Sequence, residues 1–467
     1  MIPNRASAVL DHPPRVGSRP ERVPRIVVWP RFLKFYVAVH GLWFVLYALL
    51  GKGFAYAGWA PFFVSEFLLL FAIPALIATR RVRLLVTTPI GAILVCFLLW
   101  QVFCLAPYLD LYGVDALRDS VIWAYAIFAW VAAALVVRLP RSAEILMQRY
   151  RRFTGVYIFL GPAAWLTTIY LRDWLPIWPG TSVSIPLIKG GEYGVHLAGV
   201  FAFVVQGGPA SHVWLALLIL VEELLGMSNR GGLLAFLCAA TFIVVLRPRA
   251  RRLITITFVG LTLLLTMDAL DIRFTPLGAP REMSVDVLSN SLISVFVDSQ
   301  RFDLEGTKGW RLTWWRRIWD YTFDGPYFWS GKGYGINLAD SDGFQVGTRD
   351  EPLRSPHNSH LTFLARSGVP GFLLWLLLQG TWAISMLRAH FRARRLGSPW
   401  SGLFAWLLTY WIAFVVEAGF DVSLEGPMMG VPFWTVFGLG WGSLILLKAR
   451  TSETFLAGSR EADAYRT

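Results

Sequence analysis

Long apolar runs, separated by short polar connections, dominate this chain. A membrane-spanning helix needs roughly 20 apolar residues, and about twelve runs approach that length. They lie at 35–50, 60–79, 84–106, 119–137, 153–170, 195–207, 213–227, 231–246, 253–268, 369–387, 401–418 and 431–448. The pattern predicts an all-α polytopic membrane protein with about twelve transmembrane helices.

Lys and Arg are distributed unevenly among the connections. If the N-terminus is placed inside, all four basic clusters fall on the inner side: Arg80–Arg83, 138–152, 247–252 and 388–395. Cytosolic loops of membrane proteins carry such an excess of basic residues. The charges therefore predict that both termini are cytosolic, with a basic, disordered tail at 1–34 and a second tail at 449–467.

The overall composition fits this interpretation. Only 16% of the residues are charged, whereas a soluble domain has about 25%. The net charge of +13 comes from the clusters beside apolar runs, so it does not indicate a nucleic-acid partner. The three cysteines, Cys96, Cys104 and Cys238, lie inside apolar runs and do not indicate a disulfide framework.

One outer connection is far longer than the others. Residues 269–367 are polar and separate spans 1–9 (35–268) from spans 10–12 (368–448). Long loops in compact proteins are usually functional. We expect the chemistry in this large outer loop.

His357 and His360 lie at the end of that loop, in Ser-Pro-His-Asn-Ser-His. An imidazole titrates near neutral pH and can take a proton from an attacking hydroxyl. Taken alone, the pair could equally be solvated loop histidines or an adventitious metal site.

Arg311 belongs to a segment with helical amphipathicity, residues 310–320. At about 100° per residue, the predicted apolar side carries Trp315, Ile318, Trp319 and Tyr321, and the solvated side carries Arg316, Arg317 and Asp320. Such a helix is typical of a membrane surface. Arg311 would open this helix on the apolar side, where it could bind phosphate or extend its side chain to water.

Three further segments carry candidate residues, and the last two of them are weaker signals. Arg230, in Ser-Asn-Arg-Gly-Gly, would begin the eighth span and could bind an anion or anchor the helix end. Gly331-Lys-Gly-Tyr-Gly335 is typical of a tight turn rather than a nucleotide site. Glu222 and Glu223 interrupt an apolar run, so they would face a polar cavity or lie near the interface.

These residues together resemble a known family. His357-Asn358, nine residues, Gly368, two residues and Gly371 are similar to the His-[Asn/Ser/Gln]-x9-Gly-x-x-[Gly/Thr/Tyr] pattern of the O-antigen ligase and polymerase superfamily. Arg230, Arg311 and the Gly331–Gly335 segment precede it in the family's order. The usual Ser-Arg-Gly is one residue longer here.

The resemblance implies a GT-C-like bacterial inner-membrane glycosyltransferase with a periplasmic active site. It would take glycan from undecaprenyl diphosphate without a metal or other cofactor, with Arg230 and Arg311 binding the diphosphate and His357 as general base. Asn358, Gly368 and Gly371 would support the motif. Direct displacement would invert the anomeric carbon.

The expected partners are the lipid-linked donor, a glycan or lipid A-core acceptor, membrane lipid and a chain-length regulator. Ligase, polymerase and protein O-oligosaccharyltransferase share these motifs, and the Phe420–Pro427 stretch favours an O-antigen or exopolysaccharide polymerase. The alternative class is a twelve-span secondary transporter or polysaccharide flippase, in which two related halves are common. No duplication is visible in this chain.

Overall fold

The computed structural model describes residues 31–59, 62–139, 141–206, 229–246, 302–346 and 352–464, with a few positions between 214 and 273. Its helices are α1 (Arg31–Leu50), α2 (Lys52–Ala55), α3 (Val64–Thr79), α4 (Val82–Val86), α5 (Pro89–Tyr112), α6 (Val114–Ala124), α7 (Ile127–Arg138), α8 (Ser142–Tyr170), η1 (Arg172–Trp174), α9 (Gly190–Val205), α11 (Arg230–Leu246), α14 (Phe302–Phe323), α15 (Leu338–Asp342), α16 (Ser359–Arg395), α17 (Trp400–Ala418), η2 (Ser423–Glu425) and α18 (Pro427–Ala464). Two-residue strands, β1 (Gly58–Trp59) and β2 (Phe62–Phe63), form one small antiparallel pair.

Ten apolar helices form the bundle that the structure describes. Seven are long and apolar enough to cross a membrane, counting α6 with α7 as one, and α3, α9 and α11 are shorter. They coincide with ten of the twelve predicted spans. The remaining two predictions, 213–227 and 253–268, lie almost wholly outside the described residues, as do Glu222 and Glu223.

Several helices extend beyond the predicted limits. α8 begins at Ser142 and not near 153, and α16 runs from Ser359 to Arg395. α1 begins at Arg31, so the last residues of the predicted disordered tail are helical. These extensions are polar or amphipathic, which is why a search for apolar runs does not find them.

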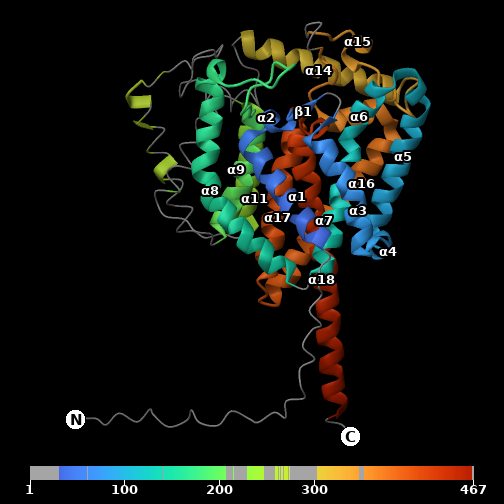
Figure 1. Ribbon diagram of the computed structural model, residues 1–467, viewed down its shortest axis with the longest axis vertical. Helices are drawn as coiled ribbons and strands as arrows, with labels where there is room; N and C mark the ends of the chain where they lie inside the picture. The colour runs from blue at the N-terminus through green and yellow to red at the C-terminus, as the bar shows by residue number, and fades with distance from the viewer. Residues whose placement is uncertain are drawn as a thin grey trace.

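Small residues allow the central helices to approach closely. A Cβ added to Gly438 or Gly442 of α18 would lie 2.3 or 2.7 Å from the backbone oxygen of Ala129 or Ala133 of α7. In membrane bundles, glycine and alanine at such positions let helix backbones pack against each other. α7 and α18 therefore form a tight central pair (Figure 1).

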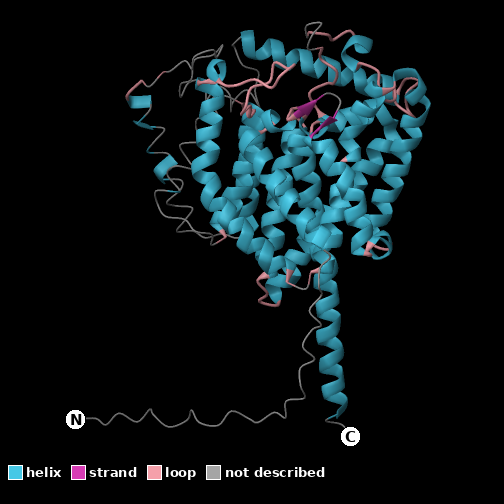
Figure 2. Ribbon diagram, viewed as in Figure 1, coloured by secondary structure: helices cyan, strands magenta, loops and turns pink. Residues whose placement is uncertain are grey.

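Helices also cover one end of the bundle. α14 and α15 lie across the end opposite to the protruding part of α18 (Figures 1 and 2). They enclose a second apolar core with the start of α16, made of Trp314, Ile318, Leu338, Ala339, Leu364, Ala365 and Val369. The described part of the predicted long loop is thus a packed layer.

Candidate active site

His357 lies directly before the N-terminus of α16, at the covered end of the bundle. Its backbone has a φ of 51°, in the left-handed region that non-glycine residues rarely adopt. Nδ1 lies 3.2 Å from Oδ1 of Asp421, and 28% of the side chain is exposed. The ring is therefore held at one nitrogen, and its Nε2 makes no hydrogen bond within the described part of the chain.

Asp421 connects His357 to the rest of the bundle. Its Oδ2 accepts a hydrogen bond from Lys189 Nζ at 3.2 Å, and the Val422 amide donates to Oδ1 at 2.8 Å. Burial raises the pKa of Asp421, but Lys189 and His357 lower it more, so the carboxylate is ionised at neutral pH. An ionised Asp421 selects the His357 tautomer that carries its proton on Nδ1.

Lys189 precedes α9 and supplies the cation of this pair. Burial lowers its pKa, and the carboxylates of Asp421 and Glu192 raise it by more, leaving it above the ordinary value. Lys189 and Asp421 are 232 residues apart in sequence. Their contact depends on the N-terminal end of α9 lying beside the C-terminal end of α17.

Arg311 reaches the same segment from α14. Its Nη1 donates to the carbonyl oxygen of Phe420 at 3.0 Å, and burial lowers its pKa. Its Nε is buried without a hydrogen-bond partner among the described residues. The prediction that Arg311 opens its helix is wrong, since α14 begins at Phe302, about two and a half turns earlier.

The predicted faces of α14 are partly right. Arg316, Arg317 and Asp320 are exposed, and Ile318 is buried, as expected. Trp319 is 48% exposed, so its placement on the apolar side is wrong. Trp314 is fully buried instead, because the buried face is centred between Trp314 and Ile318 and not on Arg311.

Arg230 begins α11 beside the same segment. The amide of Gly232 donates to the side chain of Asn229 at 2.7 Å, so Asn229 caps the helix. A Cβ on Gly231 would lie 2.9 Å from Oε2 of Glu417 and 3.0 Å from Cβ of Phe420. The backbone next to Arg230 therefore contacts the segment that Arg311 and His357 also contact.

The buried carboxyl group of Glu417 lies between Gly191 of α9 and Gly231 of α11. It is 1% exposed, and its Oε2 makes no hydrogen bond within the described residues. A Cβ on Gly191 would overlap its Oε1 at 1.7 Å. Gly191 and Gly231 thus leave the space that this carboxyl occupies below Phe420 and Asp421.

The motif residues Asn358 and Gly368 have defined structural tasks. The side chain of Asn358 accepts from the Leu361 amide at 3.0 Å and caps α16. Gly368 has a φ of 67° at a kink, and a Cβ there would lie 2.5 Å from the carbonyl oxygens of Phe328 and Trp329. Only glycine meets both demands without strain.

Gly371 and His360 pack inside the bundle. A Cβ on Gly371 would lie 2.1 Å from Oγ of Ser367. His360 accepts from Trp375 Nε1 at 3.1 Å through Nδ1 and contacts the carbonyl oxygen of Val415 at 2.9 Å through Nε2. Both of its nitrogens are engaged, so its geometry differs from that of His357.

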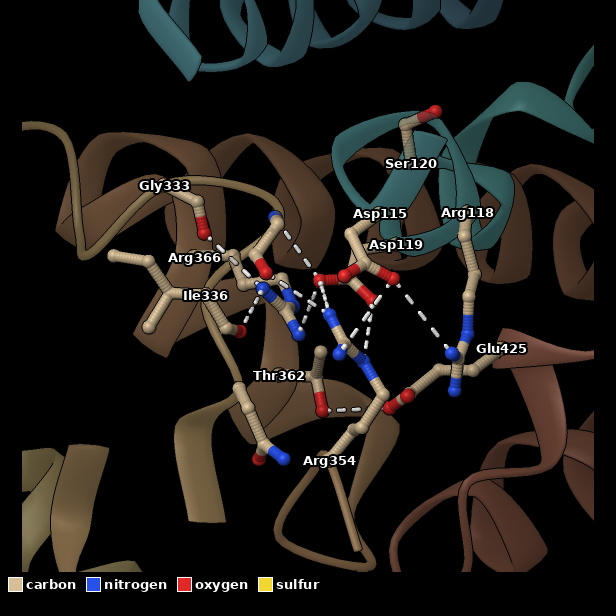
Figure 3. A network of polar contacts seen from close by, with 12 residues as sticks. Asp115, Arg118, Asp119, Ser120, Gly333, Ile336, Arg354, Thr362, Arg366 and Glu425 are labelled. Carbon is tan, nitrogen blue, oxygen red and sulfur yellow. Dashed lines mark hydrogen bonds and ion pairs between the residues drawn. The ribbon is translucent and has the colours of Figure 1, made fainter. Parts of the chain in front are cut away.

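A second polar network holds the loop that precedes His357. Asp119 of α6 lies between the guanidinium groups of Arg354 and Arg366, with contacts of 3.0 and 2.9 Å (Figure 3). Arg366 also donates to the carbonyl oxygens of Gly333 and Ile336, both at 3.2 Å. Arg354 is three residues before His357, so this network fixes where that loop leaves the bundle.

The glycine-rich segment is a turn, as expected. Gly331, Gly333 and Gly335 all have positive φ, of 62°, 77° and 96°. Lys332 between them is paired with Asp342 and lies 4.5 Å over the ring of Tyr321. Its ammonium group therefore makes its contacts within the layer that α14 and α15 form.

Residues 214–376 match the family model described as O-antigen ligase. Over this segment, the match supports the resemblance to the O-antigen ligase and polymerase superfamily. No curated protein matches it. The family implies a glycosyl-transferring membrane enzyme with a lipid-linked glycan donor and an acceptor.

The O-antigen ligase segment contains all the candidate residues that the sequence pattern singled out. They are Arg230, Arg311, His357, Asn358, Gly368 and Gly371. It does not contain Lys189, Glu417 or Asp421, which the structure adds to the site. Sequence reasoning missed them because their only signal is a charge beside an apolar run. Among the described residues, no group of three or more His, Cys, Asp or Glu side chains could hold a metal ion.

Proposed function

We propose that this protein transfers glycan from a lipid diphosphate to an acceptor hydroxyl, with His357 as the general base. The observation that carries the proposal is the hydrogen bond between His357 Nδ1 and Asp421. It leaves Nε2 to take the proton of the acceptor, as a general base must. Asp421, ionised and paired with Lys189, would stabilise the imidazolium that forms.

The bond changes balance without another reactant. The acceptor oxygen bonds to the anomeric carbon, the bond from that carbon to the diphosphate oxygen breaks, and the acceptor proton goes to His357. Attack from the side opposite to the leaving group inverts the anomeric carbon. The departing diphosphate carries the new negative charge, so it needs cationic partners more than a proton.

Arg311 and Arg230 would supply these partners. Arg311 has a buried Nε without a partner among the described residues, and its Nη1 contacts Phe420 next to Asp421. Preorganised cations at a developing anion are typically among the largest contributions to catalysis. The proposed enzyme therefore uses arginines where other transferases use a metal ion, and undecaprenyl diphosphate is the expected donor.

The proposed placement follows the positive-inside rule. The end of the bundle covered by α14 would face the periplasm, and the basic connections at the opposite end would face the cytosol. The layout would be that of a GT-C-like inner-membrane enzyme with both termini in the cytosol.

Transfer by purified protein tests the function directly. The protein would be incubated with an undecaprenyl-diphosphate glycan, in one arm alone and in the other with lipid A-core. A ladder of longer lipid-linked glycans identifies a polymerase, which the Phe420–Pro427 stretch favours, and glycan on lipid A-core identifies a ligase. Substrate counterflow in proteoliposomes without any transfer would overturn the proposal in favour of a transporter.

A further inference from the structure

A cavity of about 440 Å³ lies between α1, α7, α8, α17 and α18. Its size is within the range of pockets that hold small ligands. Trp406 and Tyr410 of α17 line it, and at 1.5 Å per residue they lie roughly 10–16 Å along the helix from Glu417. The cavity is therefore separate from the candidate active site and lies toward the other end of the bundle.

The cavity opens toward the outer surface of α1. Ala38, Gly41 and Leu42 line it and are exposed, Leu42 by 51%. In a membrane-spanning helix, exposed apolar positions face lipid. An apolar chain can therefore enter from the surrounding hydrocarbon.

Arginine lies at the edge of this opening. Arg149 of α8 lines the cavity and is exposed. Arg141, the residue before α8, and Arg151 and Arg152 of α8 are also exposed. Basic residues at a membrane surface attract anionic headgroups by about 1 kcal/mol each.

Aromatic side chains form the inner wall of the cavity. Tyr150, which is 6% exposed, has its ring centroid 4.2 Å from that of Trp406, and both residues line the cavity. The Tyr150 hydroxyl interacts with the side chains of Trp406 and Tyr410. The charged side chain that could meet a polar ligand group is therefore that of Arg149.

We propose that the cavity holds one acyl chain of an anionic phospholipid, with the lipid phosphate on Arg149. The apolar walls match the chain, and the basic start of α8 matches the headgroup. The donor lipid fits less well, because its diphosphate belongs at the far end of the bundle and cannot also bind Arg149. The exclusion of the donor lipid rests on the proposed function, which places the diphosphate at the other end of the bundle.

Photo-crosslinking in nanodiscs tests this site. The probes are phosphatidylglycerol and phosphatidylcholine with a diazirine in one acyl chain, and adducts are mapped by peptide mass spectrometry. Phosphatidylglycerol is expected to label the peptides around Gly41 and Arg149 more strongly than phosphatidylcholine. Arg149→Gln should weaken that labelling about fivefold, the effect of one basic residue at a membrane surface, and Arg152→Gln should change it less.

Filling the cavity provides the second measurement. A Cβ on Gly41 has no atom within 4 Å, so Gly41→Phe should fill the cavity without a clash and abolish the adducts. Gly155→Phe is the matched control, since Gly155 is equally open and does not line the cavity. Gel filtration would confirm that each variant is folded.

Three results would overturn the proposal. They are labelling that spares both peptides, labelling that Gly41→Phe leaves unchanged, and stronger labelling by a diazirine polyprenyl phosphate, which would make the occupant an isoprenoid. Equal labelling by the two phospholipids would remove the role of Arg149. If Gly41→Phe does not fold, the peptide mapping, the comparison of probes and Arg149→Gln still test the proposal.

Discussion

At the scale of single residues, the site depends on which nitrogen of which histidine is accessible. His357 uses Nδ1 for Asp421, whereas His360 uses both nitrogens inside the bundle. The sequence spacing, counted back from Gly371 and Gly368, had selected His357 as the base. The hydrogen bonds of the two histidines give an independent physical reason to test His357, and not His360, as the base.

His357→Ala is expected to reduce glycan transfer by about 10²- to 10⁴-fold, the usual contribution of a general base. Binding of the lipid diphosphate should persist, because the arginines remain. His360→Ala should keep most activity and lose stability through packing. Transfer rates with purified variants, with and without EDTA, measure both effects. A folded His357→Ala protein with full activity would contradict the proposed role, and rescue of activity by an added metal would contradict the metal-independent mechanism.

Asp421 should give the protein an acid-sensitive component of stability. Its pKa is lower in the folded state than in the unfolded chain, so its contribution is present above about pH 3.9 and is lost as the pH falls through the lower folded value. Thermal unfolding in detergent between pH 2 and pH 7 measures this, and the loss is expected below about pH 3.9. Asp421→Asn should be less stable at pH 7 and less sensitive to acid. Parallel curves for the two proteins would show that the Lys189–Asp421 pair does not contribute.

At the scale of elements, α14 and α16 determine where the charged groups meet. Apolar periodicity placed Arg316 and Arg317 correctly on the exposed face of α14. It could not give the start of the helix, because residues 302–309 are mostly polar and carry no apolar stripe. It also placed Trp319 wrongly, since tryptophans on both faces of a surface helix obscure the centre of the buried one.

The faces of α14 lead to a paired test. Arg311→Ala should slow transfer by about 10²- to 10³-fold, the typical loss of one group that stabilises developing charge. Arg316→Ala, on the exposed face five residues later, should leave the rate within about twofold. Initial rates at saturating donor give the comparison. Equal losses in the two variants would indicate a general effect of charge on the surface and not a specific contact.

The kink in α16 leads to a second paired test. Gly368→Ala must accept a positive φ and displace two carbonyl oxygens, so it should destabilise the protein by about 1–3 kcal/mol or more. Gly380→Ala, in the same helix with open space around it, should stabilise by up to about 1 kcal/mol. Apparent melting temperatures in detergent would separate them. If Gly368→Ala melts like the parent, the kink does not need glycine.

At the scale of the whole molecule, the bundle was largely predictable and the site was only partly so. Ten predicted spans became helices because an apolar run of that length has few alternatives to a membrane helix. Asp421 and Lys189 were not predicted as site residues, because their pairing arises only when α9 and α17 pack together. Sequence periodicity carries no information on contacts between positions 232 residues apart.

Topology follows from the charge distribution and can be measured. In a background without Cys96, Cys104 and Cys238, a cysteine at Arg317 should react with an impermeant thiol reagent added to intact cells. A cysteine at Arg395, exposed at the end of α16, should react only after the cells are opened. The reverse pattern would place the candidate site on the cytosolic side and remove the basis for a periplasmic reaction.

The segment that matches the ligase family ends at residue 376, whereas Asp421 lies in the connection after α17 and Lys189 lies before α9. This separation limits how the enzyme can be recombined with its relatives. A chimera that exchanges only 214–376 would join an imported histidine and imported arginines to a host carboxylate and lysine that were selected for another loop. Acceptor preference should therefore transfer between relatives only when the ends of α9 and α17 are exchanged together with that segment. Acceptor specificity in this enzyme is then determined by several helix ends that contact each other, and not by one continuous stretch of sequence.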